Sequence, residues 1–135
     1  MQSSYAACHN GTETPIDTDN SGVMYLNSSV HNSMIPDGLA NTIVFGEKIT
    51  SKRELGWGSG TRATIRNTGA PLNSLHEDTE PYDPCYVGGF GSAHSGFVNF
   101  GFADGSVRPL TDSIDSAVLQ SFGSRYDRSH MVSEF

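Results

Sequence analysis

Residues 17–22 have the types and spacing of the first half of a calcium-binding loop. Oxygen-bearing side chains stand at alternate positions, Asp17, Asp19 and Ser21, and Gly22 follows at the sixth position. Carboxylates spaced in this way can converge on one ion, while the glycine allows the sharp bend. Ser28 stands where an EF-hand needs a bidentate acid, so a complete EF-hand is excluded and an acid from elsewhere would have to complete the site. A plain turn rich in Asp and Asn is the favoured alternative.

The two cysteines, Cys8 and Cys85, lie far apart in the sequence and belong to no Cys-x-x-Cys pair. A four-ligand zinc site is therefore not expected, although His9 and His94 could in principle complete one. Two interpretations stay open, a disulfide worth about 4–5 kcal/mol by loop entropy or two buried thiols. A chain rich in Ser, Thr, Asn and Gly and poor in Lys suits an exported domain, which favours the disulfide.

His94 and Asp104 are residue types that pair in acid–base catalysis, but nine residues separate them. An extended segment of that length spans roughly 30 Å, so the two side chains are not expected to touch. We interpret Asp104 as a turn residue and His94 as a hydrogen-bonding residue that orders a loop. A metal-ligand role for His94 is the lesser alternative, because no partner ligand is evident. The sequence also contains no Gly-x-Ser-x-Gly elbow, and we expect no enzyme.

Trp57 stands in the glycine-dense stretch 56–60 and could form part of a stacking platform for a sugar ring. The tyrosines that could complete the platform are Tyr5, Tyr25, Tyr82 and Tyr86. A lone tryptophan is more often a plug of the core. Glycan binding is therefore a second class of function that the sequence leaves open.

The composition limits the chain to one domain and excludes several partners. The chain has 135 residues, of which 36% are hydrophobic and 17% charged, with 15 Gly and 6 Pro. These values predict a single loop-rich domain over residues 1–135. The net charge of −7 makes nucleic acid and anionic membrane poor partners, whereas it favours cations. No apolar run approaches the roughly 20 residues of a membrane span.

Several segments have the composition of strands. Residues 23–26 are the first plausible strand, and 42–47 form an apolar run that predicts a central strand. Residues 61–66 alternate as a strand does, and 67–84 predict the longest irregular loop. Residues 1–22 carry turn formers at nearly every step.

The clearest local signal is a hairpin over residues 97–110. Asp104-Gly105 lies between two apolar runs, as in a two-residue turn whose central positions both need positive φ. Such a turn pairs Phe102 with Val107 and places alternate residues of 98–102 on one face. Pro109 cannot donate to a ladder and therefore indicates an edge strand.

A short helix should follow the hairpin, capped by residues 111–113, running to about Phe122 and ending at Gly123. The residues expected on its apolar face are Ile114, Val118, Leu119 and Phe122. Together the segments predict an α+β fold, with a mostly antiparallel sheet, long Gly-rich loops and a short C-terminal helix.

Two segments resemble motifs of a known family. Residues 37–47 resemble Asp-Gly-x-Ser-Asn-Thr-Ile-x-x-Gly-Glu, with Ala40 in place of Ser, and residues 94–105 resemble the His-x9-Asp-Gly signature. The family often shows His-Pro-Gly-Gly where this chain has His94-Ser95-Gly96. Both motifs, in this order and spacing, are typical of bacterial prepilin-type proteins, the pilin-like or pseudopilin-like family, and the resemblance runs from about residue 3 to 128. The motif residues are Asp37, Gly38, Asn41, Glu47, His94, Asp104 and Gly105.

The resemblance implies a soluble head domain whose hydrophobic N-terminal helix is missing, so that membrane contact would come only through that helix. An apolar patch on the sheet should then be exposed. It further implies an extracytoplasmic, envelope or surface location and a non-enzymatic structural role, with other pilin-like or type II secretion subunits as partners. The runner-up is a calcium-dependent or glycan- or solute-binding extracellular module.

Overall fold

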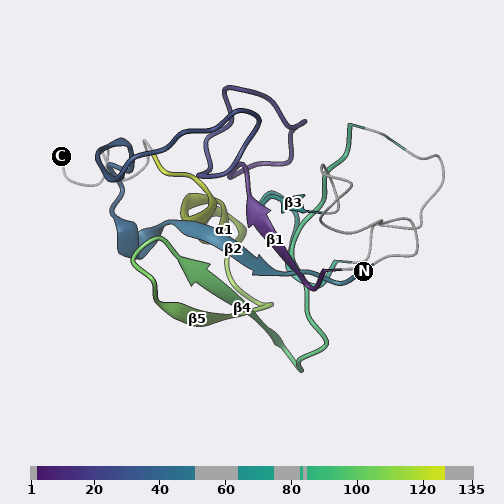
Figure 1. Ribbon diagram of the computed structural model, residues 1–135. Helices are drawn as coiled ribbons and strands as arrows, with labels where there is room; N and C mark the ends of the chain where they lie inside the picture. Colours follow the sequence, from purple (N-terminus) through teal and green to yellow (C-terminus); the bar gives the residue numbers. More distant parts are fainter. Residues whose placement is uncertain (1–2, 51–63, 75–82, 84, 127–135) are drawn as a thin grey trace.

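The computed structural model describes residues 3–50, 64–74, 83 and 85–126. It has an α+β fold, as the sequence predicts, in which a five-stranded sheet packs against one short helix (Figure 1). The strands are β1 (Tyr5–Cys8), β2 (Ile43–Glu47), β3 (Ile65–Arg66), β4 (Phe97–Phe102) and β5 (Val107–Thr111), and the helix is α1 (Ser116–Gly123). Two single 3-10 turns, Asn32–Met34 and Leu39–Asn41, precede β2. Within the described ranges, no helix has the length and apolar character needed to cross a membrane.

The order of strands in the sheet is β3-β1-β2-β4-β5, and only the β1–β3 pair is parallel. The apolar run expected as a central strand forms β2, the middle strand, so this prediction is confirmed. β5 lies at an edge of the sheet, as Pro109 indicates. Proline has no N–H to donate to a neighbouring strand, so it is tolerated in a strand that has a neighbour on one side only.

The core lies between one face of the sheet and α1. Alternate residues of β4, Val98, Phe100 and Phe102, point into it and are almost fully buried. Leu119 of α1 packs onto them. The rings of Phe90 and Phe100 meet edge to face, with their centroids 5.1 Å apart. The prediction that these three residues share one face of the strand is therefore confirmed, and the structure shows that this face is the core side.

The turn between β4 and β5 differs from the prediction by one residue. Val107 pairs with Gly101, and the Phe102 N–H donates to the Ser106 carbonyl at 2.9 Å, so the loop has three residues. Gly105 has a φ of +86°, whereas Asp104 is not in the positive-φ region. A two-residue type I′ turn needs positive φ at both central positions, and the three-residue loop needs it only at the glycine. The expected pairing of Phe102 with Val107 is therefore wrong.

The N-terminal strand was not expected from the sequence. β1 forms at Tyr5–Cys8, inside a region assigned to turns, whereas residues 23–26 form bends and a turn. The Met24 N–H reaches the Cys8 carbonyl at 3.2 Å, but Asn27 has a φ of +58° and turns the chain away. Of the predicted strand 61–66, β3 forms the last two residues and residues 61–63 lie outside the described ranges.

The helix begins later than predicted. Asp115 is its N-cap, and its Oδ1 accepts hydrogen bonds from the N–H groups of Ala117 and Val118 at 2.9 and 3.2 Å. These bonds satisfy donors that have no partner within the first turn. Leu119 faces the core as expected, whereas Val118 is 45% exposed and does not belong to the apolar face.

Candidate functional site

The antiparallel pairing of β2 with β4 brings the two motifs together at both of their ends. β2 carries the end of the 37–47 motif, and β4 connects the two halves of the 94–105 motif. Because the strands run in opposite directions, Glu47 meets the region of His94, and the turn that precedes β2 meets the turn that follows β4. The motifs thus form one continuous unit in the centre of the sheet.

At one end the side chain of Glu47 links β2 to the chain on both sides of Phe97. Its Oε1 lies 3.2 Å from His94 Nε2, and its Oε2 accepts a hydrogen bond from the Asn99 N–H at 2.8 Å. The backbone carbonyl of Glu47 accepts a hydrogen bond from the Gly91 N–H at 3.0 Å. The Asn99 N–H therefore donates to the side-chain carboxylate of Glu47 and not to its backbone carbonyl. We call this arrangement the Glu47–His94 clamp.

The loop that carries His94 is itself well tied. The Ser92 hydroxyl donates to the Phe97 carbonyl at 2.6 Å and accepts from the His94 N–H at 3.2 Å. The imidazole stacks on the Phe97 ring with the centroids 4.8 Å apart and the planes within 7° of parallel. Gly96, with a φ of +81°, makes the turn between the histidine and the strand. His94 is therefore held in place although its side chain is 48% exposed.

At the other end, backbone groups join the turns that flank the strands. The Asp104 N–H donates to the Leu39 carbonyl at 3.1 Å, and the Ala103 N–H donates to the Thr42 carbonyl at 2.9 Å. The Arg108 guanidinium donates to the Ala40 carbonyl. The turn before β2 thus lies directly against the β4–β5 turn.

Each remaining motif residue shapes one of these turns. Asn41 Nδ2 donates to the Asp37 carbonyl at 3.0 Å, and Gly38 has a φ of +96°. Asp104 Oδ1 accepts from the Ser106 hydroxyl at 2.6 Å and from its N–H at 2.9 Å. These two bonds, the hydroxyl first, hold the pKa of the Asp104 carboxyl below its usual value. Asp104 and His94 thus have different partners at opposite ends of β4.

A shallow cleft of about 330 Å³ lies beside the clamp, lined by Glu47 and His94 together with Lys48, Ile49 and Ser92 among others. A carboxylate and an imidazole in contact can share a proton or contribute two ligands to a cation. In the described part of the chain, no group of three or more His, Cys, Asp or Glu side chains gathers as a metal site would require. The arrangement is best suited to holding the two strands and the His94 loop in register.

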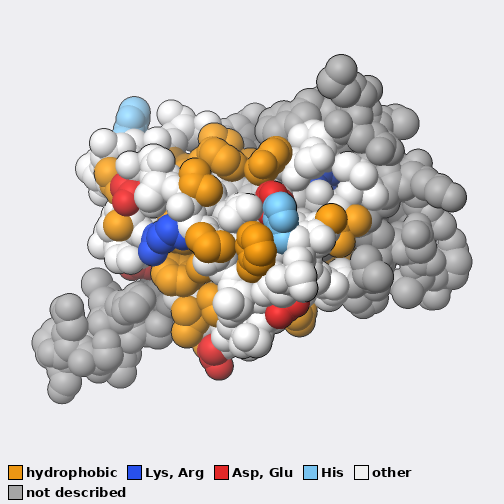
Figure 2. All heavy atoms as spheres, turned by 90° about the horizontal axis from the view of Figure 1, so that it is seen from below, with side chains coloured by type: hydrophobic (Ala, Val, Ile, Leu, Met, Phe, Trp, Pro, Cys, Tyr) orange, Lys and Arg blue, Asp and Glu red, His pale blue; other side chains and the backbone are white. Residues whose placement is uncertain are grey.

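The face of the sheet opposite the core carries an apolar surface, which we call the exposed sheet face. It comprises Tyr5, Phe45, Phe97, Val107 and Pro109, whose strand partners place them on the same side. Tyr5, Phe45 and Val107 are 47%, 44% and 69% exposed. Hydrophobic side chains gather on the underside of the molecule in Figure 2, the side on which β4 and β5 lie in Figure 1.

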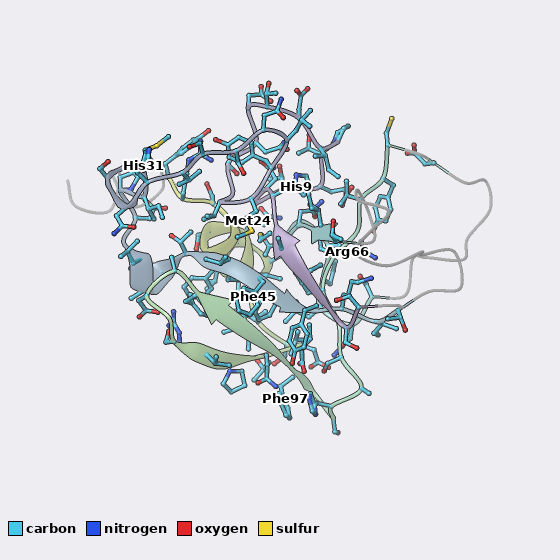
Figure 3. All side chains as sticks on the ribbon, in the orientation of Figure 1. His9, Met24, His31, Phe45, Arg66 and Phe97 are labelled. Atoms are coloured by element: carbon cyan, nitrogen blue, oxygen red, sulfur yellow. The ribbon has the colours of Figure 1, made fainter. Side chains whose placement is uncertain are left out.

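A bulge in β2 explains why a phenylalanine lies on this face. Ile43 pairs with Phe102 and Phe45 with Gly101, so the register shifts by one residue at Val44. The shift turns Phe45 outward, where it meets Tyr5 edge to face at 6.5 Å. The Phe45 ring lies across Gly101, and a Cβ there would approach it within 2.6 Å. Figure 3 shows Phe45 and Phe97 along the sheet.

In residues 17–22, the loop that resembles half of a calcium site, the side chains of Asp17 and Ser21 make separate hydrogen bonds. Asp17 and Asp19 are exposed, and Asp17 Oδ1 accepts from the Thr18 N–H at 2.7 Å. The Ser21 hydroxyl instead donates to Asn10 Oδ1 at 2.9 Å, toward the protein. The plain turn that the sequence favours therefore stays the prediction for this loop, and calcium binding stays the untested alternative.

The two cysteines are free, so the disulfide prediction is wrong. Cys8 is fully buried on β1, where its Sγ lies 3.7 Å from the Gly123 carbonyl of α1, whereas Cys85 is exposed. Burial raises the pKa of the Cys8 thiol to about 12. Their separation follows from the fold, because one cysteine belongs to the core beneath α1 and the other to the surface.

The proposed sugar platform centres on Trp57, which lies outside the described residues, as does Tyr82. Of the tyrosines that could have joined it, Tyr5 contacts Phe45 on the exposed sheet face. The guanidinium of Arg125 lies over the ring of Tyr25, with its central carbon 5.1 Å from the ring centre. These two tyrosines have separate surroundings.

A buried polar network around His9 and Glu13 was not recognised from the sequence as a unit. It also contains Asn20 and Asn67, and its members are separated by up to 58 residues. A signal was present, because polar residues directly follow both β1 and β3, where neighbouring strand ends meet. Sequence separation concealed their contacts.

Comparison with protein families places most of the chain in one of them. Residues 1–117 match the family SBP_bac_10, described as "Protein of unknown function (DUF1559)", and the chain therefore belongs to this family. The match includes all five strands and both motifs. No curated protein and no solved structure matches the chain.

Proposed function

We propose that the chain is the soluble head of a pilin-like or pseudopilin-like protein, a non-enzymatic extracytoplasmic subunit that assembles with similar subunits in an envelope filament or a type II secretion apparatus. Membership of the DUF1559 family supports the proposal, as do the two motifs on which the prepilin resemblance rests. The motif residues act by holding β2, β4 and their turns in one shape.

The single observation that carries the proposal is the exposed sheet face. A large apolar surface in contact with water is unfavourable by about 25 cal/mol per Å², and such surfaces usually mark a contact with another element. In the prepilin-type proteins that the chain resembles, an apolar helix packs against the sheet of the head. Tyr5, Phe45 and Val107 offer the flat aromatic and aliphatic surface that such a helix needs.

The test is a pair of matched substitutions in the bacterium that produces the protein. Phe45→Asp puts a charge on the exposed sheet face, and Val118→Asp puts one on α1 at nearly the same exposure, 44% against 45%. We expect Phe45→Asp to abolish recovery of the protein in sheared surface filaments or large envelope assemblies, while Val118→Asp leaves it unchanged. Thermal melts of both purified variants check that each still folds.

Two results would overturn the proposal. One is normal assembly of the Phe45→Asp variant. The other is protection of the wild-type protein from a protease added to cells whose outer envelope layer has been opened, because an extracytoplasmic head must be reached by that protease.

A further inference from the structure

The buried ring of His9, which directly follows β1, connects two asparagines from distant parts of the chain. Its Nδ1 lies 3.0 Å from Asn20 Oδ1, and its Nε2 lies 3.3 Å from Asn67 Nδ2. The residue is completely buried. Figure 3 shows His9 at the end of β1, with Arg66 of β3 close by. This network plays no part in the function proposed above, and the inference does not depend on it.

The hydrogen bonds of Asn20 determine what Nδ1 of His9 must do. Asn20 Oδ1 also accepts from the Asp17 N–H at 2.7 Å, and Asn20 Nδ2 donates to the Pro15 carbonyl at 3.2 Å. The oxygen of the amide therefore faces the ring. Nδ1 must carry a hydrogen and donate it.

The hydrogen bonds of Asn67 determine the role of Nε2 in the same way. Asn67 Oδ1 accepts from the Gly69 N–H at 3.1 Å, and Asn67 Nδ2 donates to Glu13 Oε2 at 2.8 Å. The second hydrogen of Nδ2 points to His9 Nε2, which must accept it. His9 is thus neutral, with its hydrogen on Nδ1.

Glu13 extends the network to a third segment. Its Oε1 accepts from the Val87 N–H at 2.8 Å, and its Oε2 accepts from the Gly88 N–H at 3.0 Å. A chain of hydrogen bonds through His9 and Asn67 therefore joins the 10–22 loop, the end of β3 and residues 87–88. The sequence separations of up to 75 residues show that these bonds join distant segments, in addition to the backbone bonds from the Thr68 N–H to the Asn10 carbonyl at 3.2 Å and from the Asn67 N–H to the Gly88 carbonyl at 2.9 Å.

Protonation of His9 would place two donors against each other. A hydrogen on Nε2 would face the amide hydrogens of Asn67, and rotating that amide would break its bonds to both Glu13 and Gly69. Burial is the largest cause that lowers the pKa of His9 below 6.5, against smaller opposing effects of the Asn20 bond and the Glu13 charge. The titratable and charged groups on the surrounding elements are Cys8, Glu13, Asp17, Asp19, Arg66, Tyr86 and Arg125.

We propose that neutral His9 is an acid-sensitive latch, which holds the 10–22 loop against β3 and residues 87–88 and releases this loop when the ring is protonated. Below pH 6.5 the opened chain binds a proton that the closed network excludes, so the latch weakens as pH falls.

The test is amide hydrogen exchange followed by NMR at pH 7.5, 6.5 and 5.5. At pH 5.5 we expect the exchange of the Asp17, Val87 and Gly88 amides, corrected for intrinsic rates, to rise about tenfold, because an exposed imidazole is then protonated about ten times out of eleven. The amides of β4 should not change. His31→Gln removes an exposed histidine and should keep the full response, whereas His9→Gln should lose it.

The wild-type ring supplies an independent measurement if His9→Gln does not fold. Nitrogen chemical shifts at pH 7.5 should show the hydrogen of His9 on Nδ1. A hydrogen on Nε2 would overturn the inference. So would exchange that is independent of pH at the three latch amides, or that rises equally at β4.

Discussion

Removal of the Glu47 carboxylate should weaken the contact between the two motifs at the Glu47–His94 clamp. Glu47→Ala leaves the half-buried Asn99 N–H without the acceptor that lies 2.8 Å away, and it also removes the contact with His94. A hydrogen bond to a charged group contributes about 1.5–3 kcal/mol. The contact of the carboxylate with the partly exposed His94 imidazole contributes about 0–1 kcal/mol. We therefore expect Glu47→Ala to lower the free energy of unfolding by about 2–3 kcal/mol, which is a large part of a small domain's stability.

Urea unfolding followed by far-UV circular dichroism measures this change, provided that the slope against urea stays constant. Glu47→Gln keeps an oxygen for the Asn99 N–H and should cost less than Glu47→Ala. His94→Ala should cost less than about 1 kcal/mol, and the double variant then gives the coupling between the two side chains. Asp112→Ala removes an exposed acid after β5 and serves as the control, with a change within about 0.5 kcal/mol.

Two outcomes would refute this reasoning. A Glu47→Ala cost under about 0.5 kcal/mol would mean that the carboxylate does not fasten β4. A His94→Ala cost as large as that of Glu47→Ala would mean that the histidine stabilises the loop by some route other than the clamp.

Four further predictions follow from the turns, the cap, the thiols and the loop. Gly105→Val should destabilise the domain by about 1–3 kcal/mol in a urea melt, because φ is +86° there, and Gly105→Asn should cost less. Asp115→Ala should cost about 1 kcal/mol through loss of the N-cap, seen as a lower Tm. A thiol reagent at pH 8 should modify Cys85 rapidly and Cys8 only on unfolding, and an oxidised mass two hydrogens lower would contradict the free thiols. Millimolar calcium should leave Tm unchanged, since the Ser21 hydroxyl is engaged; a rise abolished by Asp→Asn changes in the 17–22 loop would instead establish a metal site.

Local patterns were sufficient to predict the strands β2 and β4. The apolar run that became β2 and the alternation along β4 each involve near neighbours, and the side of a strand that faces the core follows from a period of two. Gly105 was recognised as a residue with positive φ because glycine adopts that conformation without strain. The number of residues in the β4–β5 loop could not be predicted, because both two-residue and three-residue loops use Asp-Gly.

The failures have a shared cause. Tyr5–Cys8 is too short to be recognised by pattern, and it becomes β1 because β2 and β3 supply partners on both of its edges. Ala6 and Cys8 then fill the core beneath α1. The four residues at 23–26 have a more strand-like composition, but no ladder with them forms in the part of the chain that the structure describes.

The sequence by itself determined the α+β class, the central and edge positions of β2 and β5, and the residues of both motifs, because these depend on neighbours in the chain. Only the tertiary structure decided the bulge at Val44 that turns Phe45 outward and the contact of Glu47 with His94. It also decided the tautomer of His9. Each of these features depends on hydrogen bonds between strands or loops that are distant in sequence. A side chain can form such a bond only after the sheet has brought the two segments together.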